Sequence, residues 1–186
     1  MTRSTVYFLW VTGIVCMILV VLSVVYLARL RASARKTWEG LLENLTSVDR
    51  QAIETVALDA IDPSGDRRTD AEARELSRDQ IWNLLGGLDG VERLERNSRV
   101  LIEMAAYVQR WHPEASSTAE DLRLEARKLE WHVGRLRAAK GNGSLELHFA
   151  SYGQDAAVSY YLMVQRLLGL YRENQIPLFG ELQKAL

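Results

Sequence analysis

The sequence is poor in the residue types that build metal centres. It has one cysteine among 186 residues, Cys16, so it can form neither an intramolecular disulfide nor a thiolate metal site. Its three histidines, His112, His132 and His148, are not spaced three or four residues apart, and none follows a Glu by three residues. Metal sites in helical bundles use such spacings because they place the ligands on one helix face. We therefore expect no metal and no cofactor.

Motifs for nucleophilic catalysis and nucleotide binding are also missing. There is no G-x-S-x-G motif, and "GGLDG" at 86–90 lacks the lysine and the preceding strand of a phosphate-binding loop. Residues 37–186 contain 18 basic and 24 acidic residues, a net charge of −6. A nucleic-acid surface needs a basic stripe in a basic domain. We therefore expect a protein that is not an enzyme and has no nucleic-acid partner.

One histidine nevertheless leaves a signalling alternative open. If His132 were exposed beside Arg135, it could accept a phosphate on a helical bundle. Phosphotransfer domains of this kind present small residues and a lysine after the histidine, whereas Val133, Gly134 and Arg135 follow here. A plain surface or packed histidine is therefore the preferred interpretation.

Charge is absent from one long stretch. Residues 6–28 are 23 consecutive uncharged and mainly apolar residues, with Tyr7, Trp10 and Tyr26 near the two ends. A helix of that length spans about 34 Å, enough for a hydrocarbon core of about 30 Å. Tyr and Trp favour the two membrane interfaces. The stretch predicts a single transmembrane helix that contains Cys16.

A cleaved signal peptide is the competing interpretation of this segment. Signal peptides have a shorter apolar core followed by a small-residue cleavage site. Here the A-x-A-like site, "ASA" at 32–34, lies between Arg31 and Arg35. The length of the run and these two charges favour an uncleaved anchor.

Four basic residues follow the apolar run: Arg29, Arg31, Arg35 and Lys36. Only Arg3 and the terminal amine precede it. Basic residues near a span end stay in the cytoplasm, so 1–5 should lie outside and the rest inside. Arg outnumbers Lys by 19 to 4, a ratio typical of GC-rich bacterial genomes, so we expect the inner membrane. The 29–36 segment can also contact anionic lipid, although a topology signal alone explains it.

Residues 37–175 show helical periodicity almost throughout, with no convincing strand pattern. Apolar residues recur at steps of three and four, and the predicted loops are short. We expect an all-α domain, an antiparallel bundle of five or six helices. The expected helices cover 38–45 (continuing the membrane helix), 48–61 (capped by Thr46 or Ser47), 70–85, 91–111, 119–140 and 145–173.

Three of these helices carry apolar seams that should form the core. The predicted core positions are Val91, Leu94, Ser98, Leu101, Ala105 and Val108; Leu122, Ala126, Leu129, Val133 and Leu136; and Leu145, Phe149, Tyr152, Ala156, Tyr160, Met163 and Leu167.

Two tryptophans and the C-terminal tail do not fit these seams. Trp131 lies two positions from Leu129 and Val133, and Trp111 stands at a predicted helix end. Exposed Trp is a frequent interface anchor, although a second core contact explains such residues too. The tail, 176–186, keeps Leu178, Phe179 and Leu182 at near-helical spacing. We expect it to fold back on the bundle; the alternative is an amphipathic hook for a partner.

These patterns favour an interaction or scaffold protein at the cytoplasmic membrane face. Its partners would be the lipid bilayer and either another protein or a second copy of the chain. The candidate partner-binding residues are Trp111, Trp131, Leu178, Phe179 and Leu182. The alternatives are the His132 relay, an enzyme whose site no motif reveals, and a sensor with a pocket for a small ligand or lipid between helices.

Overall fold

The computed structural model describes residues 37–62, 68 and 75–186, with the Glu114 side chain left out, and nine positions of the N-terminal segment: Trp10, 12–14, 16–17, 20–21 and Ser23. The chain divides into two compact units, Met1–Thr37 and Trp38–Leu186. The described positions of the first unit are helical up to Ser23. Much of the predicted membrane span, and all of 29–36, lies outside the described residues. Among the residues that are described, no helix has the length and apolar character of a membrane span.

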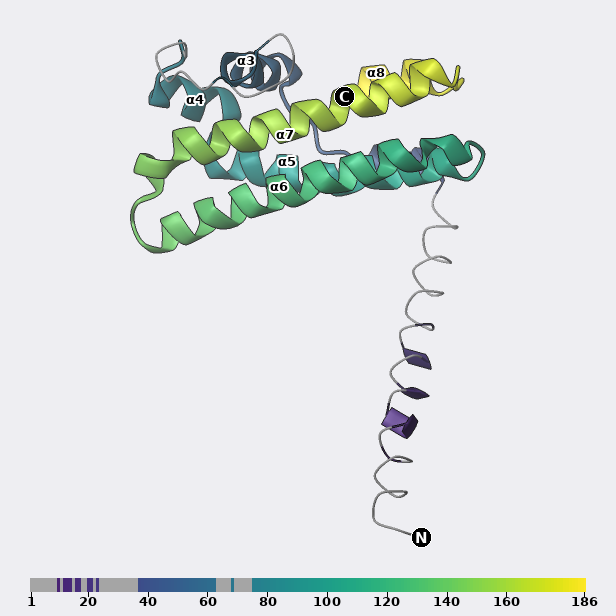
Figure 1. Cartoon of the computed structure of the whole chain (residues 1–186). Coiled ribbons are helices and arrows are strands. Elements are labelled where there is room, and N and C mark those ends of the chain that lie inside the picture. The colour runs from purple at the N-terminus through teal and green to yellow at the C-terminus, as the bar shows by residue number, and fades with distance from the viewer. Residues whose placement is uncertain are drawn as a thin grey trace. The chain divides into compact units, whose positions relative to one another are not determined.

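Three long antiparallel helices form the frame of the second unit (Figure 1). They are α5 (Gly87–Gln109), α6 (Ser116–Gly141) and α7 (Leu145–Glu173), with a 3-10 turn, η2 (Pro113–Ala115), between α5 and α6. Four shorter helices complete the described part: α2 (Trp38–Glu43), α3 (Arg50–Ala60), α4 (Arg78–Leu85) and α8 (Phe179–Ala185). In Figure 1, α3 and α4 lie along α7 on the side away from α6. The prediction of an all-α domain is confirmed, with three long and four short helices in place of five or six.

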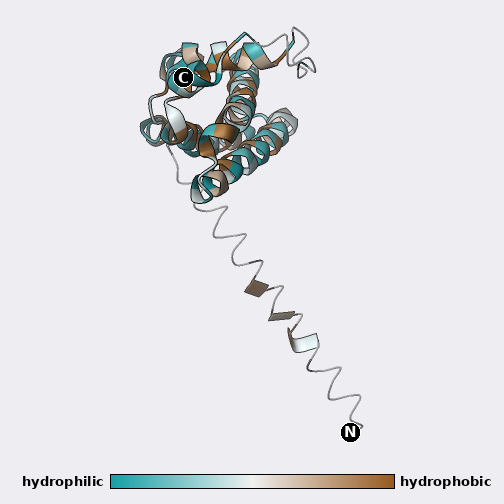
Figure 2. Ribbon diagram, turned by 90° about the vertical axis from the view of Figure 1, so that its left-hand side faces the viewer, coloured by the Kyte–Doolittle hydropathy of each residue, from teal (hydrophilic) through white to brown (hydrophobic). Residues whose placement is uncertain are grey.

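The apolar seams lie in the core as predicted. All the predicted positions of α5 and α6 are buried, and on α7 only Leu145 and Tyr152 are partly exposed. Figure 2 views the long helices nearly end-on and shows hydrophobic and hydrophilic residues on different sides of the same helix. Burial of one stripe per helix therefore holds the bundle together.

Several helix starts differ from those predicted, because local caps decide them. Asp49, rather than Thr46 or Ser47, caps α3: its Oδ1 accepts a hydrogen bond from the Ala52 amide at 3.0 Å. Ser77 and Gln80 form a capping box that begins α4 at Arg78, where the periodicity predicted a helix from Asp70. Thr37 is not helical, so α2 does not continue a preceding helix.

The turn between α4 and α5 depends on glycine. Gly86 and Gly87 have φ values of 70° and 63°, which favour residues without a Cβ. A Cβ on Gly90 would overlap the carbonyl oxygen of Leu85. The "GGLDG" segment is thus a tight reversal that brings α4 against the start of α5.

Candidate functional site

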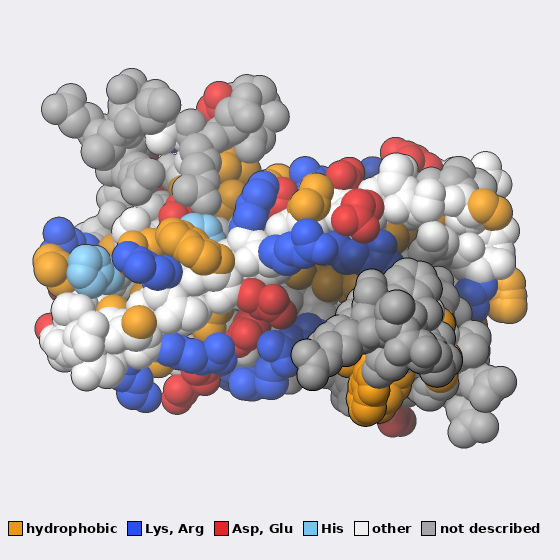
Figure 3. All heavy atoms as spheres, turned by 60° about the horizontal axis from the view of Figure 1, so that its bottom comes forward, with side chains coloured by type: hydrophobic (Ala, Val, Ile, Leu, Met, Phe, Trp, Pro, Cys, Tyr) orange, Lys and Arg blue, Asp and Glu red, His pale blue; other side chains and the backbone are white. Residues whose placement is uncertain are grey.

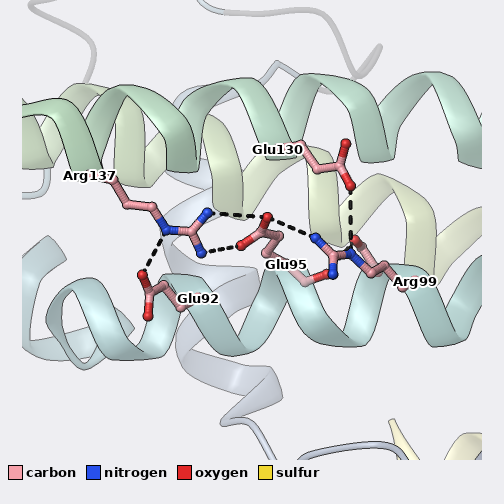
Figure 4. Close-up of polar contacts among 6 residues, drawn as sticks. Glu92, Glu95, Arg99, Glu130 and Arg137 are labelled. Carbon is pink, nitrogen blue, oxygen red and sulfur yellow. Dashed lines mark hydrogen bonds and ion pairs between the residues drawn. The ribbon is translucent and has the colours of Figure 1, made fainter.

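Ion pairs fix α6 against α5. Arg137 of α6 donates to two glutamates of α5: its Nη2 lies 2.6 Å from Glu95 Oε2, and its Nε lies 2.9 Å from Glu92 Oε1 (Figure 4). The Glu95 side chain is only 7% exposed. The hydrogen bond to Glu95, followed by that to Glu92, raises the pKa of Arg137 above its usual value. The guanidinium therefore stays charged and holds a buried carboxylate.

A second arginine extends this contact along the same two helices. Arg99 Nη2 lies 3.2 Å from Glu95 Oε1, and Arg99 Nε lies 3.6 Å from Glu130 Oε1 on α6 (Figure 4). Glu95 thus receives one arginine from each helix. Networks of this kind orient helices more firmly than isolated surface pairs.

Polar contacts also fix α6 against α7. Glu125 of α6, whose side chain is 6% exposed, accepts from Arg166 Nη1 of α7 at 3.2 Å and from Lys128 Nζ at 3.0 Å. His132 Nδ1 lies 3.6 Å from Asp155 Oδ2 on α7. Because both neighbouring helices hold α6, its rotation about its own axis is set, and its third side faces outward.

We call that third side the α6 outer face. Every member is exposed: Leu124, Arg127, Lys128, Trp131, Gly134, Arg135 and Ala138. Leu124 and Trp131 are 46% and 56% exposed, although both are large hydrophobic residues. Figure 3 shows this side of the molecule, with hydrophobic side chains set among Lys and Arg side chains. The candidate site is therefore a mixed basic and apolar helix face.

Trp131 is held in place by its neighbours despite its exposure. The Cζ atom of Arg135 lies 5.7 Å from the Trp131 ring centre and 5.6 Å from that of Tyr152 on α7. Arg135 Nη2 donates to the Tyr152 hydroxyl at 3.3 Å, and the Trp131 and Tyr152 rings meet edge-on at 5.8 Å. Cation–π and edge-to-face contacts of this kind order an aromatic side chain before any partner arrives.

His132 does not have the exposure that a phosphate acceptor needs. Its side chain is 7% exposed, lies beside Asp155 and contacts the Trp131 ring at 4.9 Å. The phosphotransfer alternative requires an exposed imidazole beside Arg135, and this condition is not met, because α7 covers this part of α6. The observed position is that of a packed histidine.

Trp111 is exposed as well, but it belongs to a different cluster. Its side chain is 60% exposed at the end of α5 and contacts Tyr107, which in turn contacts Trp38. Trp131 lies 15 residues beyond Ser116, the first residue of α6, or about 22 Å along the helix at about 1.5 Å per residue. The structure therefore does not bring the two tryptophans into one site.

The C-terminal tail folds back on the bundle as α8. Leu182 is fully buried, and Leu178 and Phe179 pack against the core. Glu181 accepts a hydrogen bond from Trp38 Nε1 at 2.7 Å, which ties the tail to the first helix of this unit. Leu182 is therefore part of the core, and Leu178 and Phe179 are partly buried against it.

Apolar periodicity does not identify the buried carboxylates, although the sequence contains one signal of them. Glu95 stands four residues after Val91 and three before Ser98, two positions predicted to face the core. That spacing puts Glu95 on the inward side of α5, where a carboxylate needs a cation from another helix. Only the fold identifies that cation as Arg137.

A cavity of about 420 Å³ lies between the start of α3 and the α4–α5 turn. Its lining residues are Ser47, Val48, Asp49, Ile53, Asn83, Leu84, Leu85, Gly86, Gly90, Arg93 and Leu94. The sensor hypothesis expects an apolar gap between helix seams, whereas this cavity is bounded by charged and amide side chains as well as by apolar ones. Among the residues that the structure describes, no three His, Cys, Asp or Glu side chains come together as a metal site.

Comparison with known proteins adds nothing to this geometry. No protein-family model matches the chain, and no curated protein and no solved structure matches it.

Proposed function

We propose that this chain is a membrane-tethered interaction protein whose helical unit holds a protein partner on the α6 outer face. The observation that carries the proposal is Trp131, which is 56% exposed yet packed against Arg135 and Tyr152. An exposed aromatic side chain that is already ordered buries much area on binding and loses little rotamer entropy. It is the residue type most often found at interface hot spots.

The frame around Trp131 supports the same function. Ion pairs of Arg137, Arg99 and Glu125 bind α6 to α5 and α7. The orientation of the α6 outer face relative to these helices is therefore fixed. A rigid helix face positions binding residues more accurately than a loop does.

The proposed tether is the uncharged run 6–28, with Arg29, Arg31, Arg35 and Lys36 keeping the helical unit on the cytoplasmic side. Confinement to the membrane plane raises the effective concentration of any partner that is also anchored there. A modest interface would then suffice for stable association.

The partner-binding role is tested by comparing the two exposed tryptophans. A photo-cross-linking amino acid at position 131 of the full chain, in native membranes, should give a discrete adduct with a second protein. Trp131→Ala should lose that protein in co-purification, whereas Trp111→Ala should retain it, because Trp111 lies in a separate cluster. If both variants retain it equally, the partner does not use the α6 outer face.

The tether is tested separately. The full chain should resist extraction from membranes at alkaline pH, whereas a chain that begins at residue 37 should be extracted. A C-terminal reporter that is active only in the cytoplasm should be active. Neutral residues at the four basic positions should reduce that activity, because the positive charge that retains the unit inside is lost. Recovery of the full chain in the alkaline extract would refute the tether.

A further inference from the structure

We infer that the α6 outer face binds an acidic amphipathic helix of a different protein. This inference rests on the proposed function, since it names the kind of partner that the same face takes. It follows from the shape of the face, its charge and the identity of the residues on either side of Trp131.

The shape of the face suits a helix. Leu124, Trp131 and Ala138 are spaced by seven residues, so at about 100° per residue they lie within about 20° of one line along α6. Beside that line, a Cβ on Gly134 would meet no atom within 4 Å. A line of apolar residues with a small residue beside Trp131 is the surface against which a second helix packs its own apolar stripe.

The charge of the face selects an acidic partner. α6 contains six basic residues (Arg123, Arg127, Lys128, Arg135, Arg137 and Lys140) and four acidic ones (Glu120, Asp121, Glu125 and Glu130), a net charge of +2 in a unit of −6. The charged residues of the α6 outer face are Arg127, Lys128 and Arg135, all basic. Glu125 is buried against Arg166, and the exposed Glu130 pairs with Arg99 of α5. Positive charge therefore dominates the outward side, although most of the unit is acidic.

The arrangement of these charges is specific as well. Arg127 and Arg135 stand four residues before and four after Trp131, which places one cation on either side of the indole. The Arg127 side chain makes no ion pair or hydrogen bond with the part of the chain that the structure describes. Carboxylates on a helix laid across Trp131 would pair with both arginines.

A second copy of the chain does not fit the same face. An antiparallel pair of α6 helices centred on Trp131 would set Arg127 of one copy against Arg135 of the other. A parallel pair would set each cation against itself. Like charges facing each other across an interface disfavour association, so two copies of the α6 outer face should not pair with each other.

An anionic membrane surface fits the charge but not the apolar content. Helices that lie in a lipid interface bury a broad side of large apolar residues. The large apolar residues of the α6 outer face are only Leu124 and Trp131, which are two turns apart with Arg127 and Lys128 between them. A protein helix, which brings its own leucines and carboxylates, complements it better.

Designed peptides test this inference on the full-length chain in detergent. The probe is a labelled helical peptide of about 21 residues, with Leu at the heptad a and d positions and Glu beside them. Its companion has Lys in place of each Glu. Fluorescence anisotropy should show binding of the Glu peptide only, and the affinity should fall as salt is added.

Charge reversal identifies the face that binds. The variant R127E/K128E/R135E should lose about tenfold or more in affinity for the Glu peptide and gain affinity for the Lys peptide. The control R78E/R96E/K184E changes the net charge equally at exposed positions elsewhere and should bind as the parent chain does. Arg127→Glu alone should weaken binding in the same direction without disturbing any described ion pair.

Three results would overturn the inference: equal binding of both peptides, an equal loss in the control variant, or displacement of the Glu peptide by anionic phospholipid added to the detergent micelles. These results are separable from failure of the proposed function. If position 131 cross-links a protein in membranes while the Glu peptide fails to bind, the proposed partner-binding function is supported and the inference of an acidic partner is refuted. If neither occurs, both fail.

Discussion

At the scale of single residues, the most informative feature is the placement of carboxylates inside a helical bundle. Glu95 and Glu125 point inward, and each binds an arginine from a neighbouring helix. A buried carboxylate without a cation is unstable, so each pair specifies which helices can be neighbours. These pairs therefore contribute more to specifying one arrangement of the helices than to the free energy of unfolding.

Removal of Arg137 should expose this dependence. Arg137→Ala leaves Glu95 buried with only Arg99, and we expect the free energy of unfolding to fall by about 1–3 kcal/mol. This is less than the roughly 3–5 kcal/mol of a fully buried pair, because Arg137 is 48% exposed. Urea denaturation followed by circular dichroism measures the change. Arg96→Ala, at an exposed position of α5, should stay within about 0.5 kcal/mol, and equal losses in both variants would contradict the role of Glu95.

A pH dependence follows from two buried tyrosines. Burial raises the pKa of Tyr171 and of Tyr160 above the value near 10 that each has in the unfolded chain. The folded state therefore keeps protons that the unfolded state loses. The contribution of these groups to stability is complete below about pH 10 and is lost as the pH rises above it.

Tyr171→Phe should change this dependence. At pH 8 the variant should be less stable by about 1 kcal/mol, because Tyr171 donates a hydrogen bond to the Met104 carbonyl oxygen at 3.4 Å. At pH 11 the difference should shrink or reverse, since the variant has one fewer group whose ionisation favours unfolding. Urea denaturation at both pH values measures it. An unchanged difference would show that Tyr171 does not resist ionisation in the folded state.

At the scale of elements, the short turn between α4 and α5 restricts which residues can occupy it more than the long helices do. Gly86 and Gly87 adopt positive φ values, and Gly90 approaches the Leu85 carbonyl too closely for any side chain. This reversal places Leu85 and Ile81 against the bundle. A three-glycine turn thus determines how α4 is attached to the frame.

Two alanine substitutions should act in opposite directions. Gly90→Ala forces a Cβ into the Leu85 carbonyl and should destabilise the unit by about 3 kcal/mol or more, since backbone cannot move aside cheaply. Gly134→Ala, in open space in the middle of α6, should stabilise it by about 0.5–1 kcal/mol through helix propensity. Thermal unfolding of the two variants measures both effects. A tolerated Gly90→Ala would show that the turn is looser than the structure has it.

Long seams were easier to predict than helix starts. The bounds of α7 are those that the periodicity indicated, because a continuous apolar stripe ends where Pro177 and the polar residues before it begin. The start of α4 was missed because the Ser77–Gln80 box, rather than hydrophobic spacing, begins that helix. Local hydrogen bonds outweigh periodicity wherever the apolar pattern is short.

At the scale of the whole molecule, the helical unit has its own core. Among the described residues, those of the core begin at Trp38, which packs between Tyr107 and Tyr171 and donates to Glu181. The Trp38 indole therefore joins α2, the first helix of the unit, to α8, the last one. This contact connects the N-terminal and C-terminal ends of the unit.

A chain beginning at residue 37 should therefore fold alone. We expect the fragment 37–186 to give the circular dichroism spectrum of a helical protein and to unfold in one cooperative transition. A chain beginning at residue 46 lacks α2 and should be less stable by about 3–5 kcal/mol, because it loses the buried Trp38 and Leu41. Urea denaturation compares the two fragments. Equal stability would mean that α2 is not part of the core.

The sequence by itself determined the helical class, the buried seams of α5, α6 and α7, and the position of Trp131 off its seam. These properties depend on residues a few positions apart, which periodicity reports directly. It also contains the uncharged run and the basic residues after it, from which the membrane tether is proposed.

Only the tertiary structure decided which of these residues are available for binding. His132 and Leu182 became buried, whereas Trp111 and Trp131 stayed exposed in separate clusters. The deciding contacts join residues that are distant in the chain, 42 positions apart for Glu95 and Arg137 and 143 for Trp38 and Glu181. Local spacing cannot specify such pairs, because they exist only once the helices have packed.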